Sequence, residues 1–506
     1  MLASLSSATV FGVSGHPVTV EVHVSSGLPG YTLVGLPDAS CRESRDRVRA
    51  AILSSGLTWP MKRVTVNLAP TNLPKSGAGL DLAIAVGVLL ASEQIRLGVD
   101  ERLALLGELG LDGSLRSVAG ALPMVASLRD SDAVLVPPAN VREASALGRI
   151  KVRTVPDLRT LIAVLAGDEP WPDTEVGRPV APAAPAPDLS EVRGQAVARL
   201  ALEVSAAGGH NLLMVGAPGA GKTMLAERIA PLLGDLDDEA AISVSSVHSS
   251  AGLALPEDGL IRRPAFRAPH HTASLVSMVG GGTRQMRPGE ISLASDGVLF
   301  LDELGEFPAA VLDALRQPLE EGVIRVSRAH ATAVLPARTL LIAAMNPCPC
   351  GLAGTAHCRC SEANLNRYAR RVSGPLLDRF DLRVRVHPTA RADLIDDHPS
   401  ESSRDVASRV ATVRRRAMER GVSSNASLAA VVVREVTSID PSAERLLAAA
   451  VDRGRLSGRG LERVRRVALT LDDLRGGIGV LDQQVVAQAL ALRMQIDLSG
   501  RQATVA

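Results

Sequence analysis

Gly216-Ala217-Pro218-Gly219-Ala220-Gly221-Lys222-Thr223 is the stretch that decides the fold. It follows an apolar run, Leu212–Val215, and precedes a helical pattern from Met224 to Leu233. A strand, a glycine-rich loop and a helix in this order form the context of a P-loop. The N–H groups of such a loop surround phosphate oxygens, while Lys222 reaches the β- and γ-phosphates and the Thr223 hydroxyl holds Mg²⁺. The full eight-residue match in this context favours nucleoside triphosphate binding over a chance glycine-rich turn.

The composition is that of a soluble globular chain with several cores. The 506 residues carry a net charge of +1, and 46% are hydrophobic and 22% charged. This length has room for about two to four domains. The balanced charge excludes a uniformly basic coat for nucleic acid. Any contact with DNA or RNA would have to come from a local patch or from the inside of a ring.

A cytoplasmic protein with no membrane partner is expected. Residues 1–20 lack the basic segment and apolar stretch of a signal peptide. The longest apolar run, Leu82–Ala91, is too short to span a bilayer. Four of the five cysteines lie between Cys348 and Cys360, which does not describe a secretory disulfide framework.

The chain divides into three parts and a linker. Residues 1–166 read as an α+β domain, with strands at Val18–Val24 and Arg63–Leu68. Prolines alternate with alanines over residues 167–188, which favours an extended linker. An α/β pattern with the P-loop covers residues 189–395. Residues 396–506 are helical, with helices predicted at 404–420, 441–452, 460–474 and 482–496.

Polar side chains follow two further apolar strands of the α/β part. Asp302 and Glu303 come directly after Val298–Leu301, and Asn346 follows Thr339–Met345. We expect Asp302 to bind Mg²⁺ and Glu303 to polarise the attacking water. Asn346 suits a sensor of the γ-phosphate or of that water, although an asparagine before a proline also suits a turn.

A long insertion is expected between the P-loop and this carboxylate pair. Lys222 and Asp302 are 80 residues apart, which is more than two neighbouring strands need. The segment 262–292 is the candidate insertion. Its adjacent His270 and His271 could suggest a metal site, but neighbouring residues on a strand point to opposite faces. A role in an inserted hairpin or pore element, or local packing, is favoured.

Four cysteines form the pattern C-x-C-x₇-C-x-C. They are Cys348, Cys350, Cys358 and Cys360, with His357 adjacent. Four thiolates this close in sequence can hold a tetrahedral structural Zn²⁺, although C-x₂-C spacing is commoner. Reduced thiols or a redox pair are the alternatives. A catalytic zinc is not expected, because nothing nearby resembles an open site with a base.

Two arginines are candidates for contacts with phosphate. Arg379 stands between Asp378 and Asp381 shortly after the sensor strand, where a ring ATPase places an arginine finger for the neighbouring subunit. Arg459 opens a helix of the C-terminal part and could be a second phosphate sensor. A lone arginine is usually a solvated or salt-bridged residue, and only the position in the series of motifs favours these roles.

The chain resembles the magnesium-chelatase-like branch of the AAA+ ATPases, of the ComM/YifB type, over essentially its whole length. The resemblance rests on specific strings: Ala206–Leu213, Arg267–His271, Arg287–Ser292, Val298–Leu304, Met345–Cys350 and Ser373–Leu382. It implies an N-terminal Lon-protease-like domain of the ribosomal S5 domain 2-like fold, a P-loop AAA+ α/β core and a C-terminal helical lid. It also implies ATP and Mg²⁺ as cofactors and a homohexameric ring with ATP sites between subunits.

For function, the resemblance implies a DNA helicase that drives branch migration during recombination in transformation. Arg325, Arg328 and His330, in the stretch 323–334 before the sensor strand, could contact a phosphate backbone. One alternative is a chelatase-type motor that remodels a protein partner. Another is an ATP-dependent protease, but aligning Pro74-Lys75 with the Lon motif puts Gly79 at the serine position. Ser76 and Lys151 are the remaining candidates for a dyad, and neither convinces, so no peptide hydrolysis is expected.

Overall fold

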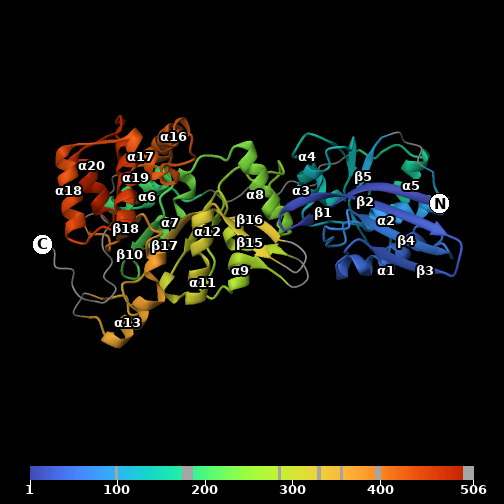
Figure 1. Ribbon diagram of the computed structural model, residues 1–506, viewed down its shortest axis with the longest axis horizontal. Helices are drawn as coiled ribbons and strands as arrows, with labels where there is room; N and C mark the ends of the chain where they lie inside the picture. Colours follow the sequence, from blue (N-terminus) through green and yellow to red (C-terminus); the bar gives the residue numbers. More distant parts are fainter. Residues whose placement is uncertain are drawn as a thin grey trace.

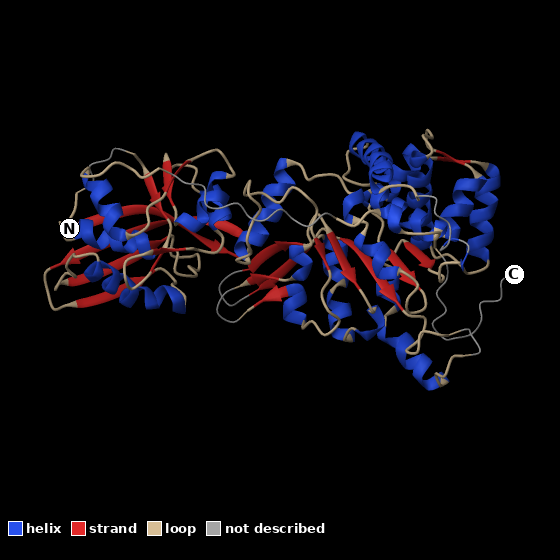
Figure 2. Ribbon diagram, turned by 180° about the vertical axis from the view of Figure 1, so that it is seen from behind, coloured by secondary structure: helices blue, strands red, loops and turns tan. Residues whose placement is uncertain are grey.

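Three regions follow one another along the long axis of the molecule. The computed structural model describes residues 1–96, 101–173, 186–282, 286–327, 332–353, 357–391, 393 and 400–493. Strands and helices up to α5 form one end, a parallel sheet lies in the middle, and helices α16–α20 form the other end (Figure 1). Seen from behind, the strands form two separate large groups (Figure 2).

The N-terminal region is a seven-stranded mixed sheet with helices. Its strand order is β3-β4-β2-β1-β5-β8-β9, and β1 and β2 form a ten-pair antiparallel ladder closed by a turn at Gly12 and Val13. Alternate residues of β2 are buried, which matches the period of a strand with one covered face. The strands predicted at Val18–Val24 and Arg63–Leu68 are confirmed. The strands are β1 Leu2–Phe11, β2 Ser14–Ser25, β3 Gly30–Val34, β4 Arg63–Ala69, β5 Leu103–Leu105, β8 Ala133–Leu135 and β9 Lys151–Arg153, with a small hairpin of β6 Glu108–Leu109 and β7 Leu115–Arg116.

The helices of this region cover the sheet. The longest apolar run, Leu82–Ala91, lies within α2, and all but one residue of this helix are buried because it packs against both β1 and β2. The helices are α1 Ala39–Ser54, α2 Asp81–Ala91, α3 Ala121–Ser127, α4 Val141–Ser145 and α5 Leu158–Ala166. Of the predicted linker 167–188, residues 174–185 lie outside the described residues.

The central region is a five-stranded parallel sheet in the order β11-β14-β17-β10-β18. The expectation that the P-loop strand β10 and the carboxylate strand β14 are neighbours is wrong, because β17 lies between them. The long sequence separation of Lys222 and Asp302 reflects the elements between them, which run from α8 (Asp238–Ser250) to α10 (Glu290–Leu293). The strands are β10 Leu212–Val215, β11 Phe266–Arg267, β14 Val298–Leu301, β17 Leu340–Met345 and β18 Leu382–Arg385.

The two faces of this sheet are buried against different helices. Leu212 and Met214 share a core with α6 and the C-terminal helices, whereas Leu213 and Val215 face a core that includes α11. The helices and short strands are α6 Ala196–Gly208, α7 Lys222–Glu227, α8 Asp238–Ser250, α9 Leu275–Val279, β12 Gly280–Gly281, β13 Arg287–Pro288, α10 Glu290–Leu293, α11 Ala309–Ala314, α12 Arg316–Glu321, β15 Val323–Ser327, β16 Thr332–Pro336, α13 Glu362–Arg371 and α14 Gly374–Leu377.

The C-terminal region is helical, as expected, and is fused to the central core. Val406 of α16, Val464 of α19 and Val485 of α20 belong to the same buried cluster as Leu212 of the P-loop strand. The elements are α16 Ser403–Glu419, α17 Ala430–Val436, β19 Ser438–Ile439, α18 Pro441–Asp452, α19 Gly458–Leu474, β20 Val480–Leu481 and α20 Gln483–Ala491. The last predicted helix, 482–496, is therefore shorter than expected within the described residues.

Among the described residues, the contacts of the N-terminal region with the central region include one at α8 and one at β16. Helix α3 packs against α8, where Gly120 N–H donates to Ser249 O at 2.8 Å and Ser249 Oγ donates to Glu143 Oε2 at 2.6 Å. The turn between β1 and β2 lies on β16, since a Cβ at Gly12 would be 2.9 Å from Ala333 Cβ. No described helix has the length and hydropathy to cross a membrane.

Candidate functional site

The P-loop connects the end of β10 to α7 and holds Lys222 in a defined position. Lys222 Nζ donates to Gly216 O at 2.8 Å, to Ala217 O at 2.9 Å and to Asn346 Oδ1 at 3.1 Å. Burial lowers the pKa of Lys222, whereas the charges of Asp302 and Glu303 act to raise it. The Lys222 ammonium group thus lies between two backbone carbonyls of the P-loop and the side chain of Asn346, the residue that directly follows strand β17.

Thr223 and Asp302 meet at the same edge of the sheet. Thr223 Oγ1 donates to Asp302 Oδ2 at 2.8 Å, which joins the first turn of α7 to the end of β14. A hydroxyl and a carboxylate in contact are oxygen donors of the kind that Mg²⁺ prefers. The two predicted magnesium ligands are therefore side by side, and with Lys222 and Asn346 they come from three adjacent strands.

Glu303 contacts a histidine that sequence reasoning did not place in the site. His271 Nδ1 lies 3.1 Å from Glu303 Oε2. Glu303 itself has a φ of 52°, a left-handed backbone conformation that is uncommon for a residue with a side chain. The sheet order explains the contact: β11 pairs with β14 in parallel, so the residues after β11 lie beside the residues that end β14.

The expectation that His270 and His271 point to opposite faces of a strand is wrong. Strand β11 ends at Arg267, and both histidines follow it outside any strand. Their ring centroids are 4.1 Å apart. His271 faces Glu303, whereas His270 is exposed and bonds to Thr272. The contact of His271 with Glu303 follows from the pairing of β11 with β14, and no local sequence pattern predicts it.

A pocket of about 290 Å³ opens beside these groups. Thr223, Asp302, Glu303 and His271 line it, together with Phe300 and part of the segment after β11. The pocket thus combines the candidate magnesium ligands with the candidate base. A water molecule held there would meet a carboxylate whose orientation is fixed by an imidazole.

Arg379 and Arg459 are not brought to the P-loop of their own chain. Within the described ranges, neither forms a hydrogen bond or ion pair with residues 216–223. Arg379 lies between α14 and β18, and its Nη2 is 2.5 Å from Glu320 Oε2 of α12. Arg459 is the second residue of α19 and is exposed. An arginine that acts on a neighbouring subunit, as predicted for Arg379, requires no contact within its own chain.

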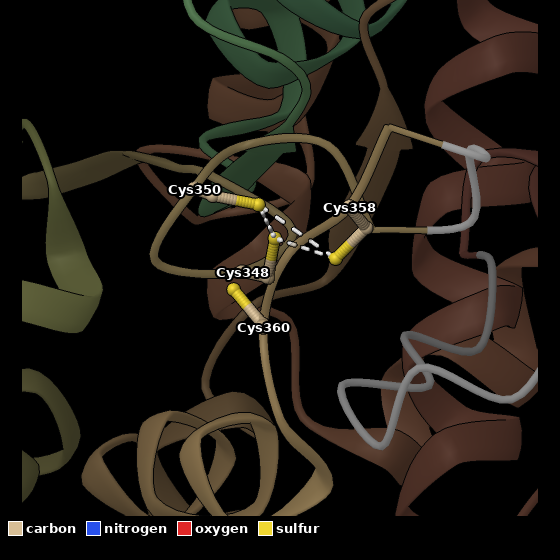
Figure 3. Close-up of side chains that lie close together, drawn as sticks. All are labelled: Cys348, Cys350, Cys358 and Cys360. Atoms are coloured by element: carbon tan, nitrogen blue, oxygen red, sulfur yellow. Dashed lines mark hydrogen bonds between the residues drawn. The ribbon is translucent and has the colours of Figure 1, made fainter.

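The four cysteines gather in one cluster between β17 and α13 (Figure 3). All four Sγ atoms lie within 4.8 Å of one another, and three of the separations are 3.4, 3.7 and 3.9 Å. Hydrogen bonds from the backbone of Arg359 and Leu352 lower the pKa of Cys350 to about 6. Burial raises the pKa of Cys348 to about 12. The four predicted residues therefore lie in one cluster that could hold a metal ion.

The candidate protease dyad does not form. Ser76 Oγ donates to Val10 O at 2.9 Å, and Lys151 Nζ forms an ion pair with Glu101 at 3.3 Å. Lys75 is fully buried and donates to Pro70 O. Within the described residues, Ser76 Oγ therefore forms no hydrogen bond with a lysine of the kind that a Ser–Lys dyad requires.

The predicted phosphate-contacting stretch forms a hairpin of β15 and β16. Arg325 on β15 is exposed and pairs with Glu321. Arg328 and His330 lie outside the described residues.

Comparison with known proteins places these features in a family. The model described as "Magnesium chelatase, subunit ChlI" matches residues 188–394. "Subunit ChlI of Mg-chelatase" matches residues 20–140, and "Magnesium chelatase, subunit ChlI C-terminal" matches residues 400–493. Similar full-length proteins include one from Mycobacterium tuberculosis, 45% identical over 96% of this chain and 97% of its own. YifB of Escherichia coli is 41% identical over 97% of both chains, and the competence protein ComM of Haemophilus influenzae is 41% identical over 98% of both.

Proposed function

The chain belongs to the magnesium-chelatase-like family that includes YifB and ComM, and on that premise we propose that it is an ATP-hydrolysing AAA+ motor that assembles into a ring and acts on DNA. The observation that carries the ATPase is the meeting of Lys222 with Asn346 and of Thr223 with Asp302 at one edge of a parallel sheet. Ligands of open α/β sheets bind at this edge, beyond the carboxyl ends of the strands.

The proposed mechanism assigns one task to each side chain. Lys222 binds the β- and γ-phosphates, and Thr223 and Asp302 hold Mg²⁺, which supplies positive charge to the phosphates when bound. Glu303 accepts the proton of the attacking water while His271 holds its carboxylate, and Asn346 orients the γ-phosphate or that water. Arg379 of a neighbouring subunit stabilises the charge on the transferred phosphoryl group. Arg459 is proposed as a further phosphate contact.

On the basis of the family relationship, we propose a role for each of the three regions. Residues 1–166 are proposed as an S5 domain 2-like module, residues 189–395 as the AAA+ core, and residues 396–506 as the lid. The engagement of Ser76 with Val10 O and of Lys151 with Glu101 supports a non-proteolytic role for the first region, in assembly or in guiding substrate. The cysteine cluster is proposed to hold a structural Zn²⁺, because its donor set and sulfur separations fit that ion.

DNA as the substrate rests on the relationship to a competence protein and on the exposed Arg325 of the hairpin formed by β15 and β16. The test measures ATP hydrolysis with and without single-stranded, forked and four-way-junction DNA, together with strand displacement. Lys222→Ala should abolish nucleotide binding. Glu303→Gln should retain binding and lose hydrolysis by at least about 100-fold, the scale of a lost general base.

The outcomes separate the two halves of the proposal. ATP hydrolysis that no DNA structure stimulates would exclude the DNA motor and leave the ATPase. Hydrolysis that survives Lys222→Ala would exclude the ATPase site itself. The family descriptions also support a second candidate, a chelatase-type motor that remodels a protein partner. Co-purification with a metal-ion-adhesion-type partner, with no response to DNA, would favour that candidate.

A further inference from the structure

We infer that a metal ion held by Cys348, Cys350, Cys358 and Cys360 controls the nucleotide affinity and the hydrolysis rate of the P-loop site, by fastening three parts of that site together. This inference rests on the proposed nucleotide function. It assigns the cysteine cluster a regulatory task in addition to a structural one.

The cluster has the dimensions of a tetrahedral thiolate site. With zinc–sulfur bonds of about 2.3 Å, the sulfurs of a tetrahedron are about 3.8 Å apart. The separations of 3.4, 3.7 and 3.9 Å bracket this value. All four cysteines are free thiols. The ligand set is complete without His357 and leaves no open position.

The cysteine loop touches the P-loop directly. Gly351 follows Cys350 and has a φ of 77°, and a Cβ at this position would lie 2.3 Å from Pro218 Cδ. Only glycine allows this approach. The turn is closed by Gly351 N–H, which donates to Cys348 O at 2.9 Å. The position of Pro218 in the phosphate-binding loop is therefore set by the turn between the first two cysteines.

The beginning of the cysteine loop is joined to the sensor strand. Cys348 is two residues beyond Asn346, whose side chain accepts from Lys222. The carbonyl of Asn346 accepts from Tyr368 Oη at 3.1 Å. Tyr368 belongs to α13 and is buried. The backbone of the sensor residue is thus held from both sides, by the cluster and by the helix that follows it.

The end of the cysteine loop leads to the turn that follows Glu303. Cys360 immediately precedes Ser361, the N-cap of α13. From this helix the Tyr368 ring covers Gly305, where a Cβ would lie 2.4 Å from the ring, and Arg371 Nη1 donates to Gly305 O at 3.0 Å. Gly305 is two residues beyond the proposed base. Helix α13 therefore links the cluster to the backbone that carries Glu303.

Four metal–sulfur bonds would stabilise the folded conformation of this loop. Residues 348–360 have no helix or strand in their described part, so the backbone alone holds them weakly. Metal binding of this kind contributes directly to local folding and removes chain entropy. When the metal leaves, Pro218, Asn346 and Gly305 lose their common support. The P-loop site should then bind nucleotide more weakly and orient water less well.

The first experiment measures metal and nucleotide on the full chain. Purified protein should contain about one zinc per chain, measured by mass spectrometry, and a mercurial thiol reagent should release it. The metal-free protein should remain folded by circular dichroism and bind a fluorescent ATP analogue at least 10-fold more weakly, and zinc added after removal of the mercurial should restore binding. Cys358→Ser should act like metal removal, whereas Cys41→Ser, at the one cysteine outside the cluster, should not.

A pair of glycine variants tests the mechanical link without touching a ligand. Gly351→Ala should keep its zinc but bind nucleotide more weakly, because the new methyl group meets Pro218. Gly421→Ala is the matched control, since Gly421 has a φ of 80° and nothing within 4 Å of its Cβ position. Equal nucleotide affinity of these two variants would overturn the inference.

Absence of bound metal even with excess zinc, or unchanged nucleotide affinity on metal removal, would overturn the inference while the ATPase stands. Failure of the zinc-loaded wild-type protein to bind any nucleotide would instead overturn the proposed function, and this inference with it.

Discussion

His271 contacts the proposed base, and its removal should slow hydrolysis without weakening ATP binding. Its Nδ1 is 3.1 Å from Glu303 Oε2, and within the described part of the chain it forms no hydrogen bond or ion pair with the P-loop. His271→Ala leaves the carboxylate free to rotate, so kcat should fall by about 10-fold, a fraction of what a lost base costs. The dissociation constant for ATP should stay within about twofold. Single-turnover hydrolysis and nucleotide titration measure the two quantities.

His23→Ala is the control for this prediction. His23 is an exposed histidine of β2 in the N-terminal region and is not among the residues that line the pocket, whereas His270 lines the pocket and packs on His271. The His23→Ala protein should hydrolyse ATP at the wild-type rate. A His271→Ala protein that loses ATP binding and hydrolysis in parallel would contradict a positioning role.

Most candidate residues of the site could be predicted from sequence, because they follow recognisable apolar strands. Lys222, Thr223, Asp302 and Asn346 were predicted in this way, and the structure brings them into contact. The contact of His271 with Glu303 could not be predicted, because it depends on which strands are neighbours in the sheet. The C-x-C spacing identified the thiol cluster, but not the contact of Gly351 with Pro218, which involves residues distant in sequence.

At the scale of elements, the hairpin of β15 and β16 is expected to contact nucleic acid. Arg325→Ala should weaken binding of single-stranded DNA and reduce the salt dependence of the affinity by about 0.7 in the log–log slope for each lost phosphate contact. Fluorescence anisotropy between about 50 and 200 mM salt measures this slope. Arg338→Ala is the control, since this exposed arginine lies beyond β16 and pairs with Asp296. Equal effects of the two substitutions would argue against a specific role of the hairpin.

Element types were predictable, but some boundaries and the strand order were not. The helix predicted at Met224–Leu233 ends at Glu227, because Pro231 cannot continue it and lies in a separate short helical turn, Ala230–Leu232. The Arg228 side chain also donates to Met224 O within the helix and to Asp188 O. The contact with Asp188 is a tertiary contact. Apolar runs predict strands, yet they do not say which strand inserts between β10 and β14.

At the scale of the whole molecule, the contact between α4 and α8 should depend on pH. Burial raises the pKa of Glu143, while hydrogen bonds from Ser249 and Asn140 act to lower it. A carboxyl group with a raised folded-state pKa contributes its full stability below its unfolded pKa of about 4.3, and loses it as the pH rises through the raised value. Glu143→Gln keeps an acceptor for Ser249 and removes the buried charge.

The variant should therefore have a higher Tm than wild type at pH 8, and the difference should shrink toward pH 4.5. Both tryptophans, Trp59 and Trp171, pack against the N-terminal core, so their fluorescence reports the unfolding of that region within the full chain. Asp46→Asn, at an exposed position of α1, controls for removal of any carboxylate. A Tm difference that does not vary with pH would exclude titration of Glu143 as the cause.

The ladder of β1 and β2 is a long, continuous element of the N-terminal region. Its ten paired residues span about 33 Å, and its turn lies on β16 at one end. Each degree of tilt at that turn displaces the other end by about 0.6 Å, given this length. A tilt of this ladder about its turn would therefore be largest at the opposite end of the two strands, at Leu2 and His23, and it would require the contact of α3 with α8 to shift. Distances between spin labels at this strand end and on β16, measured with and without nucleotide, would test whether such a tilt occurs.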